Sequence, residues 1–517
     1  MTLAQRLRRL PPERLLGIRR GVEKESLRAL PTGSLALTPH PAALGSPLTH
    51  PHITTDYSES QLELITGVHG DAAGVVDELT QLHQFVYRHI GEELLWPGSM
   101  PCGLPADETI PIGRYGTSNI GRAKSVYRMG LGLRYGRRMQ TISGIHYNWS
   151  LPGVDSDGYF ALIRNFRRHS FLLLTLFGAS PAVCPSFVEG RQHNLLALPG
   201  PDPAVVHTLH LPYATSLRMG NLGYQSDAQA ALAVSYNCLE SYAGSLDGAL
   251  TRPFPPYERI GVRNLGGEYN QLATSLLQIE NEFYGTIRPK RVIRSGERPL
   301  HALRDRGVEY VEVRCMDLDP FEPVGIQAQT MRFLDVFLLH CLLSDSPPDT
   351  PEEIAALARN QQRTATRGRE PGLRLERAGR EVTLQSWGEE ILAQCAPLAE
   401  ALDAAKGGEA HAEALEAARR QLADLTSLPS SRVLAAIQRD GQGSYTRFVR
   451  GCAEAIRRNM LDRPLAPAVE ARMHAEAAAS LAEQARIEAA DSEPFEVFRQ
   501  RYVDPIHLMP RREGQAL

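Results

Sequence analysis

Acidic side chains two residues apart are the most informative feature of this sequence. In the segment GIRRGVEKESL, Glu23 and Glu25 have this spacing, and Gln61 and Glu63 repeat it in QLELI, a few residues after Asp56. Alternate side chains of a β-strand point to the same face of the sheet. The two segments therefore predict strands that each present acidic or polar side chains on one face and apolar ones on the other.

Two further segments show the same alternation with other chemistry. In GIHYNWSL, His146 and Asn148 share a face, while the intervening aromatic and aliphatic residues point away. In GVEYVEVRC, Glu312 and Arg314 project together, opposite valines. Four predicted strands thus offer carboxylates, an imidazole, an amide and a guanidinium.

These polar faces can be interpreted in two ways. A solvated antiparallel sheet also alternates polar and apolar residues, and this explains any one strand taken alone. Solvent faces usually carry lysine and mixed charges, however, whereas these faces are rich in carboxylates. Carboxylates that line one cavity repel each other unless cations are present. Oxygen ligands with one imidazole suit Mg²⁺ or Mn²⁺ better than zinc, so the pattern indicates a site for a hard divalent ion.

A basic cluster lies in the segment ENEFYGTIRPKRVIR. Arg288, Lys290 and Arg291 surround Pro289, which disfavours a regular helix there. Such side chains can hold phosphate oxygens by charge-assisted hydrogen bonds. A solvated basic loop is the alternative interpretation.

Tyrosines in polar, glycine-containing stretches are the last candidates. Tyr127, Tyr224 and Tyr284 fall in such stretches. They could line a pocket for a small molecule, although buried structural tyrosine is the more common case.

The elements that must position these residues lie in the first two thirds of the 517-residue chain. Residues 1–345 mix short alternating segments with turns, whereas residues 346–517 are rich in helix-forming residues. The Pro-rich segment SDSPPDTP separates them. The second part could be an interaction module, a coiled coil or a helical layer packed on the first; lack of a sustained heptad pattern favours the helical layer.

Composition and missing motifs exclude several classes of protein. There are 56 Lys and Arg residues against 59 Asp and Glu, which gives no basic field for nucleic acid or a membrane surface. No P-loop and no nucleophile elbow occur. The seven cysteines form no CxxC pair and predict reduced thiols, not a disulfide framework or a zinc site. With no signal peptide or membrane-spanning run, we expect a cytoplasmic protein.

Nine ordered blocks of the sequence resemble the glutamate–cysteine ligases of the gammaproteobacterial type. They cover most of residues 17–345, and the match is weak beyond that point. The blocks are GIRRGVEKESLR, LTHPHITTDYSESQLELIT, WPGSMPC, YGTSNIGRAKSVYRMGL, MQTISGIHYNWSLP, LFGASPAVC, LPYATSLRMGNLGY, LLQIENEFYGTIRPKR and GVEYVEVRCMDLDPF.

The resemblance implies an α+β fold related to glutamine synthetase. In it a curved antiparallel sheet forms an active-site funnel surrounded by helices, with a helix-rich C-terminal part. The resemblance assigns the divalent ions to Glu23, Glu25, Asp56, Glu63, His146 and Glu312.

The resemblance also gives roles to the other candidates. Arg314, with Glu312, falls at a catalytic position facing the glutamyl carboxylate or the transferred phosphoryl group. Gln140 and Asn148 match the glutamate pocket. The cysteine subsite corresponds to Tyr127, Arg218, Tyr224 and Tyr284. The nucleotide-side block contains Arg288, Lys290 and Arg291.

The implied reaction is ATP-dependent ligation of glutamate to cysteine through a γ-glutamyl phosphate, the first step of glutathione synthesis. It needs Mg²⁺, or Mn²⁺ in its place, with ATP as co-substrate, and no nucleic acid, membrane or obligate protein partner. Three alternatives stay open: a ligase that accepts another amine, a two-metal phosphohydrolase, and a non-catalytic binding protein. The first alternative would use an amine other than that of cysteine as the acceptor. The second would release phosphate without any amine acceptor.

Overall fold

A seven-stranded antiparallel sheet organises the computed structural model, which describes residues 2–202, 204–223, 227–230, 232–294 and 297–508. Tyr224, a predicted substrate-binding residue, lies outside them. The strand order is β2-β3-β1-β5-β10-β9, and β4 pairs with the far end of β1. The strands are β1 (Arg19–Ala29), β2 (Ile53–Thr55), β3 (Gln61–Ile65), β4 (Leu94–Leu95), β5 (Ile145–Ser150), β9 (Ile287–Lys290) and β10 (Tyr310–Met316).

The strand register brings the predicted polar positions onto one face. Glu25 on β1 lies opposite Glu63 on β3, and Glu23 lies opposite His146 on β5. Glu312 on β10 lies opposite Asn148 of β5. The four strands predicted from alternation are therefore confirmed, and they are neighbours in one sheet.

Three helices cover the other face of the sheet: α3 (Ala72–His89), α6 (Ser156–Phe177) and α12 (Ala328–Leu343). Tyr147, Trp149, Val311 and Val313 point into this layer and are at most 1% exposed. These apolar residues alternate with the polar ones along each strand. The helices therefore bury one face of the sheet, and the polar side chains lie on the other face.

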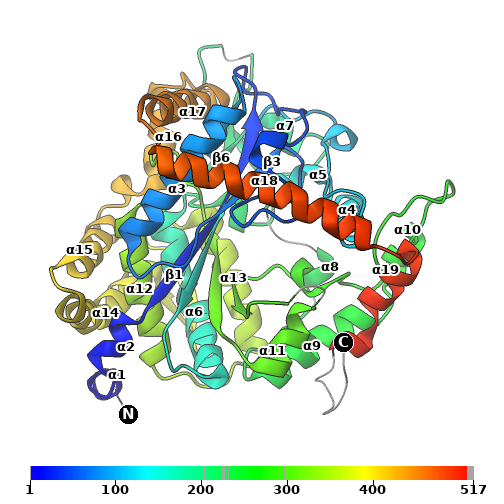
Figure 1. Cartoon of the computed structure of the whole chain (residues 1–517). Helices are drawn as coiled ribbons and strands as arrows, with labels where there is room; N and C mark the ends of the chain where they lie inside the picture. The colour runs from blue at the N-terminus through cyan, green and yellow to red at the C-terminus, as the bar shows by residue number, and fades with distance from the viewer. Residues whose placement is uncertain (1, 203, 224–226, 231, 295–296, 509–517) are drawn as a thin grey trace.

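The C-terminal helices pack on this layer. α14 (Leu384–Lys406) and α15 (Ala410–Ala423) lie against α12, and α17 (Tyr445–Asp462) packs on α3 (Figure 1). The helix after the Pro-rich segment, α13 (Pro351–Arg367), begins with Pro351, and the Thr350 side chain accepts a hydrogen bond from the backbone N–H of Glu353. The later helices are α16 (Pro429–Arg439), α18 (Pro467–Ala490) and α19 (Phe495–Val503). Between α13 and α14, β11 (Arg374–Arg377) pairs with β12 (Arg380–Thr383).

The remaining elements are short or peripheral. A small sheet has the order β6-β8-β7, formed by β6 (Ala182–Val183), β7 (Leu196–Ala197) and β8 (Leu209–His210). The helices are α1 (Leu3–Arg8), α2 (Pro12–Leu16), α4 (Asn119–Tyr135), α5 (Arg137–Gln140), α7 (Pro185–Val188), α8 (Asp227–Ala230), α9 (Leu239–Thr251), α10 (Pro255–Ile260) and α11 (Pro299–Arg306). Single 3₁₀ turns are η1 (Ala42–Leu44), η2 (Asp107–Thr109), η3 (Leu217–Met219), η4 (Glu280–Glu282), η5 (Leu425–Ser427) and η6 (Pro505–Leu508).

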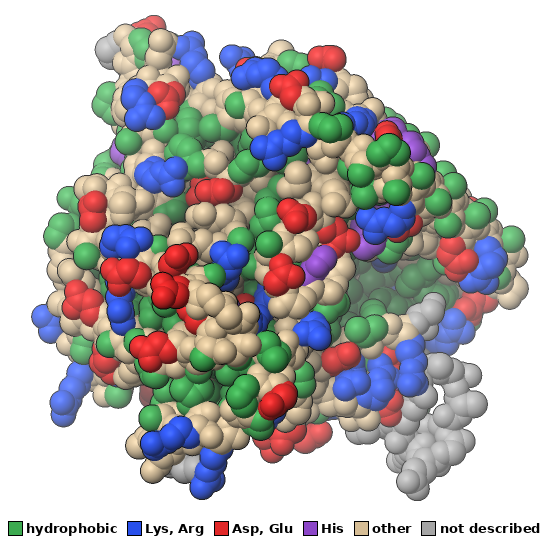
Figure 2. Space-filling model, turned by 60° about the vertical axis from the view of Figure 1, so that its left-hand side comes forward, with side chains coloured by type: hydrophobic (Ala, Val, Ile, Leu, Met, Phe, Trp, Pro, Cys, Tyr) green, Lys and Arg blue, Asp and Glu red, His purple; other side chains and the backbone are tan. Residues whose placement is uncertain are grey.

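Acidic and basic side chains are intermixed over the face shown in Figure 2, and no patch of one sign dominates it. Among the described helices, none combines the length and the apolar character needed to cross a bilayer.

Candidate active site

Five predicted ligand residues meet on the polar face of the sheet. Glu23, Glu63 and His146 place one ligand atom each within 4.8 Å of one another. Glu25 and Asp56 form a second group of the same size with Glu63. The two groups share the Glu63 carboxylate, so this residue lies at the centre of the cluster.

Hydrogen bonds orient the first group. One Glu23 oxygen lies 3.1 Å from Nδ1 of His146, and the other accepts a hydrogen bond of 2.9 Å from the Asn148 side chain. His146 also lies 3.6 Å from a Glu25 oxygen through Nε2. Asn148, predicted to line the glutamate pocket, thus holds a predicted metal ligand.

The Glu25 carboxylate is fixed by the backbone of the neighbouring strand. It accepts a hydrogen bond of 2.7 Å from the N–H of Gly144. A Cβ atom at Gly144 would lie 2.1 Å from Nη2 of Arg218, so only glycine fits between the two side chains. The glycine that precedes β5 therefore lets an arginine pack directly beside the acidic cluster.

Uncompensated negative charge changes the acidity of this cluster. Burial, followed by the Asp56 carboxylate, raises the pKa of Glu25 to about 8. Burial and the Glu23 and Asp56 carboxylates raise the pKa of Glu63 well above its ordinary value. Raised pKa values in a cluster of carboxyls are typical of a site that binds cations.

Glu312 has a different environment. Lys290 lies 3.2 Å from one of its oxygens, and Arg314 lies 3.0 Å from the other. Burial acts to raise the pKa of Glu312, but the charges of these two side chains hold it well below the ordinary value. Glu312 belongs to neither ligand group, although it lies 3.7 Å from His146. Protein cations already neutralise this carboxylate.

A cavity opens beside Arg314 and Arg218 and is also lined by Met219, Tyr284, Gly285, Thr286 and Gln361. Arg218 is 1% exposed and donates a hydrogen bond of 2.9 Å to the backbone oxygen of Arg314. The Gln140 amide donates one of 2.7 Å to the Tyr284 hydroxyl. Three residues predicted for substrate binding, Arg218, Gln140 and Tyr284, therefore meet near Arg314.

Tyr127 lies on α4, beside these residues. Burial, followed by Glu282 and Tyr284, raises its pKa well above the ordinary value of tyrosine. Its phenol is therefore neutral and available for hydrogen bonding.

The predicted basic cluster divides between two environments. Arg288 and Lys290 line a second cavity, between β9, α9 and α11, and Lys290 contacts Glu312. Arg291 instead donates a hydrogen bond of 2.6 Å to the backbone oxygen of Gly307 and lies near Glu309. The geometry thus joins Arg288 and Lys290, but not Arg291, to the site.

Three residues near the site were missed by sequence reasoning. Arg128 follows Tyr127 in the chain; it hydrogen-bonds the backbone oxygen of Asp56, and its charge acts to lower the pKa of Glu63. The position of Arg128 next to Tyr127 in the sequence could have identified it as a candidate. Asp317 accepts hydrogen bonds from Ser180 and Ser216 next to Arg218. Gln361 lines the cavity from α13, and no sequence motif around it indicates this position.

The donors present fit hard divalent cations. The two ligand groups contain four carboxylates and one imidazole, with no thiol. Such oxygen-rich sets suit Mg²⁺ or Mn²⁺. The raised pKa values of Glu25 and Glu63 supply an independent reason, because bound cations would keep both carboxyls ionised.

Comparisons with known proteins point in one direction. A family model described as glutamate-cysteine ligase matches residues 5–364. The glutamate–cysteine ligase of Alcanivorax borkumensis is 47% identical over 510 residues, covering 94% of this chain and 96% of that protein. The one from Pseudomonas aeruginosa is 49% identical over 506 residues, with 93% of each chain covered.

A solved structure agrees with the sequence relatives. The crystal structure of glutamate–cysteine ligase from Francisella tularensis in complex with AMP has a TM-score of 0.88 and 36% sequence identity to this chain. The similarity covers 94% of this chain and 97% of that one, so it includes the C-terminal helices.

Proposed function

The chain belongs to the glutamate–cysteine ligase family, and on this premise we propose that it uses ATP to join the γ-carboxylate of L-glutamate to the amine of L-cysteine. The observation that carries the proposal is the half-buried acidic cluster centred on Glu63, with Arg314 and a cavity beside it. The product is γ-glutamylcysteine, with ADP and phosphate released.

We propose Mg²⁺, replaceable by Mn²⁺, as the resident cation, held by Glu23, Glu25, Asp56, Glu63 and His146. Bound there, it would offset the negative charge of two anionic reactants, which is the main barrier to phosphoryl transfer onto a carboxylate. Glu312 contributes differently: its ion pairs with Lys290 and Arg314 hold both cationic groups over the polar face.

The reaction takes place in two steps. The γ-carboxylate oxygen of glutamate attacks the γ-phosphorus of ATP, and the bond to ADP breaks. The cysteine nitrogen then attacks the acyl carbon of γ-glutamyl phosphate, and phosphate leaves. Arg314 stabilises the charge on the transferred phosphoryl group, because its guanidinium lines the cavity and lies 3.0 Å from Glu312 on the polar face of the sheet.

Each substrate has a proposed location. Arg288 and Lys290 contact the nucleotide phosphates, since both are basic, buried or half-buried, and adjacent to Glu312. Gln140 and Asn148 orient glutamate. Arg218, Tyr127 and Tyr284 form the cysteine subsite, together with Thr286 of the same cavity. Tyr224 belongs to the same proposed subsite but lies outside the described residues. The enclosure protects the acyl phosphate from water.

The test is phosphate release from ATP and Mg²⁺, with glutamate and cysteine added singly and together. We expect rapid release only when both amino acids are present. Release that needs no amine and does not respond to cysteine would overturn the proposal in favour of a phosphohydrolase. Replacing cysteine by 2-aminobutyrate or alanine then measures how far the acceptor pocket depends on the thiol.

A further inference from the structure

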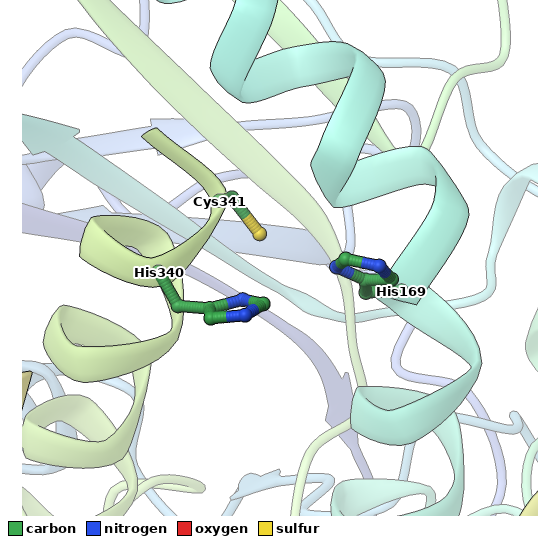
Figure 3. Close-up of side chains that lie close together, drawn as sticks. All are labelled: His169, His340 and Cys341. Carbon is green, nitrogen blue, oxygen red and sulfur yellow. The ribbon is translucent and has the colours of Figure 1, made fainter. Parts of the chain in front are cut away.

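A third group of side chains that could hold a metal ion lies outside the acidic cluster and differs from it in chemistry. His169 on α6 and His340 and Cys341 on α12 each place one ligand atom within 4.8 Å of the others. Figure 3 shows both imidazole rings and the Cys341 sulfur turned toward the space between the two helices. These helices cover the face of the sheet that is opposite to the active site.

Two of the ring nitrogens are buried without a hydrogen-bond partner. Nδ1 of His169 and Nδ1 of His340 have none within the described residues, although almost no solvent reaches either atom. His340 is 0% exposed as a whole residue, and the two ring centroids are 5.4 Å apart. A buried polar atom without a partner is costly, so such atoms mark strain or a missing ligand.

The contacts of His340 resemble those of a metal-ligating histidine. Its Nε2 lies 2.9 Å from the side-chain oxygen of Gln394 on α14. A glutamine oxygen only accepts, so Nε2 carries the proton and Nδ1 keeps its lone pair. Metal-bound histidines usually donate their other N–H to an oxygen in this way, which fixes the tautomer and the ring orientation.

The two imidazoles of the group are neutral, which is the form that ligates a metal. Burial and the nearby His340 keep the pKa of His169 well below its ordinary value, so the ring is neutral. Burial raises the pKa of the Cys341 thiol, and the buried Cys395 of α14 adds to the effect. A cation would release the thiol proton and compensate the resulting charge.

We propose that His169, His340 and Cys341 form a site for a borderline-soft transition-metal ion of the Zn²⁺ class that links α6 to α12. Two imidazoles and a thiolate are typical zinc ligands and differ from the oxygen donors of the active site. A tetrahedral zinc site holds its donor atoms about 3.5 Å apart, so donor atoms that lie within 4.8 Å of one another need to approach by no more than about 1.3 Å on binding. Water would complete the coordination.

The experiment adds one equivalent of Co²⁺ or Zn²⁺ to the metal-free full-length protein. Thiolate-bound Co²⁺ gives a charge-transfer band in the near ultraviolet, and carboxylate-bound Co²⁺ in the active site does not. We expect the band in the wild-type protein and about one zinc retained per chain after desalting. Absence of the band in the wild-type protein would overturn the proposal.

Matched variants locate the site. Cys341→Ser and His169→Gln should remove the band and weaken zinc binding at least tenfold. Cys452→Ser on α17 and His474→Gln on α18 should change neither. If Cys341→Ser and His169→Gln bind zinc like the wild-type protein, the proposal is wrong. Zinc should also raise the melting temperature of the wild-type protein, and that measurement needs no variant. Glutamate–cysteine ligation does not enter these readouts, so the outcome is independent of the proposed function.

Discussion

The two faces of the central sheet treat buried charge in opposite ways. On the helix-covered face, Arg20 makes a bidentate pair with Asp335 at 2.7 and 3.2 Å, and Tyr147 donates a hydrogen bond to the same carboxylate. On the polar face, Glu25 and Glu63 lie together, and their pKa values are raised by burial and like charge. Strands β1 and β5 contribute to both arrangements.

This difference separates structural charge from functional charge. A buried ion pair with its partners in place needs nothing further, and its removal damages the fold. An acidic cluster that exceeds its protein cations is unstable until a ligand neutralises it. By this criterion we propose that Asp335 is structural, that Glu63 is functional, and that Glu312 lies between them, since Lys290 and Arg314 hold it at the edge of the site.

The largest expected effect is on the polar face. Glu25→Gln and Glu312→Gln should each lower kcat/KM at least 10³-fold, which is about 4 kcal/mol of transition-state stabilisation. Steady-state phosphate release measures the loss, and circular dichroism verifies the fold. Above pH 8, where Glu25 is ionised, Glu25→Gln should leave the metal-free protein as stable as the wild type or more so, because one repelling carboxylate is gone. Wild-type turnover in either variant would contradict its assigned role.

On the helix-covered face, a substitution should lower stability and leave activity nearly unchanged. Asp335→Asn leaves the Arg20 guanidinium buried without its counter-charge and should cost about 3 kcal/mol of unfolding free energy. Urea denaturation measures it. At low temperature, the folded variant should keep kcat/KM within about threefold. A thousandfold loss of activity without loss of stability would place Asp335 in the site and remove the contrast between the faces.

The pH dependence of stability should also have opposite signs on the two faces. The pKa of Glu25 is raised from 4.5 to about 8, so the folded state binds the proton more tightly. Its stabilising contribution is complete below 4.5 and is lost as pH rises toward 8, by at most about 1.4 kcal/mol per pH unit. In the metal-free protein, urea unfolding should show this decline relative to Glu25→Gln, and Mg²⁺ should flatten it.

Lys24, on the opposite face of β1, provides the comparison. Burial lowers its pKa from 10.5 to about 7, and Nζ lies 2.8 Å from His83 and 2.6 Å from Ser26. Because the folded pKa is depressed, stability from this group is complete above 10.5 and is lost as pH falls toward 7. Lys24→Met should remove that slope above neutral pH. If stability changes with pH in Lys24→Met as it does in the wild type, Lys24 is not the group that causes the change.

The smallest effect concerns the basic strand β9. Lys290→Ala should lower kcat/KM at least tenfold, since Nζ contacts Glu312 on the polar face. Arg291→Ala should change it less than twofold, because this side chain hydrogen-bonds the backbone oxygen of Gly307 instead. The two neighbours serve as controls for each other in the same kinetic assay. Equal losses would mean that both reach the nucleotide.

The sequence predicted the strands because period-two alternation is a local signal. Glu23, Glu25, Glu63 and His146 occupy the faces expected from that alternation, and the family comparison confirms the fold and the reaction class. Their mutual distances came from strand register, which local spacing does not encode.

Long-range partners could not be predicted. Asp335 neutralises Arg20 from 315 positions away, and Gln361 reaches the cavity from the C-terminal part. The division at residue 345 remains a proposal, and α13 makes the boundary less sharp than composition suggested. Likewise, cysteine spacing gave no sign of the proposed zinc site, because His169 comes from a different helix than Cys341.

Direct metal binding tests the central claim that uncompensated carboxylates on the polar face are the cation site. Mn²⁺ binding to the metal-free protein is followed by electron paramagnetic resonance in the wild type, Glu63→Gln and Asp335→Asn. Because both ligand groups share Glu63, we predict that Glu63→Gln weakens Mn²⁺ binding at least tenfold. Asp335→Asn should bind Mn²⁺ like the wild type. Undiminished Mn²⁺ binding in Glu63→Gln would contradict the account.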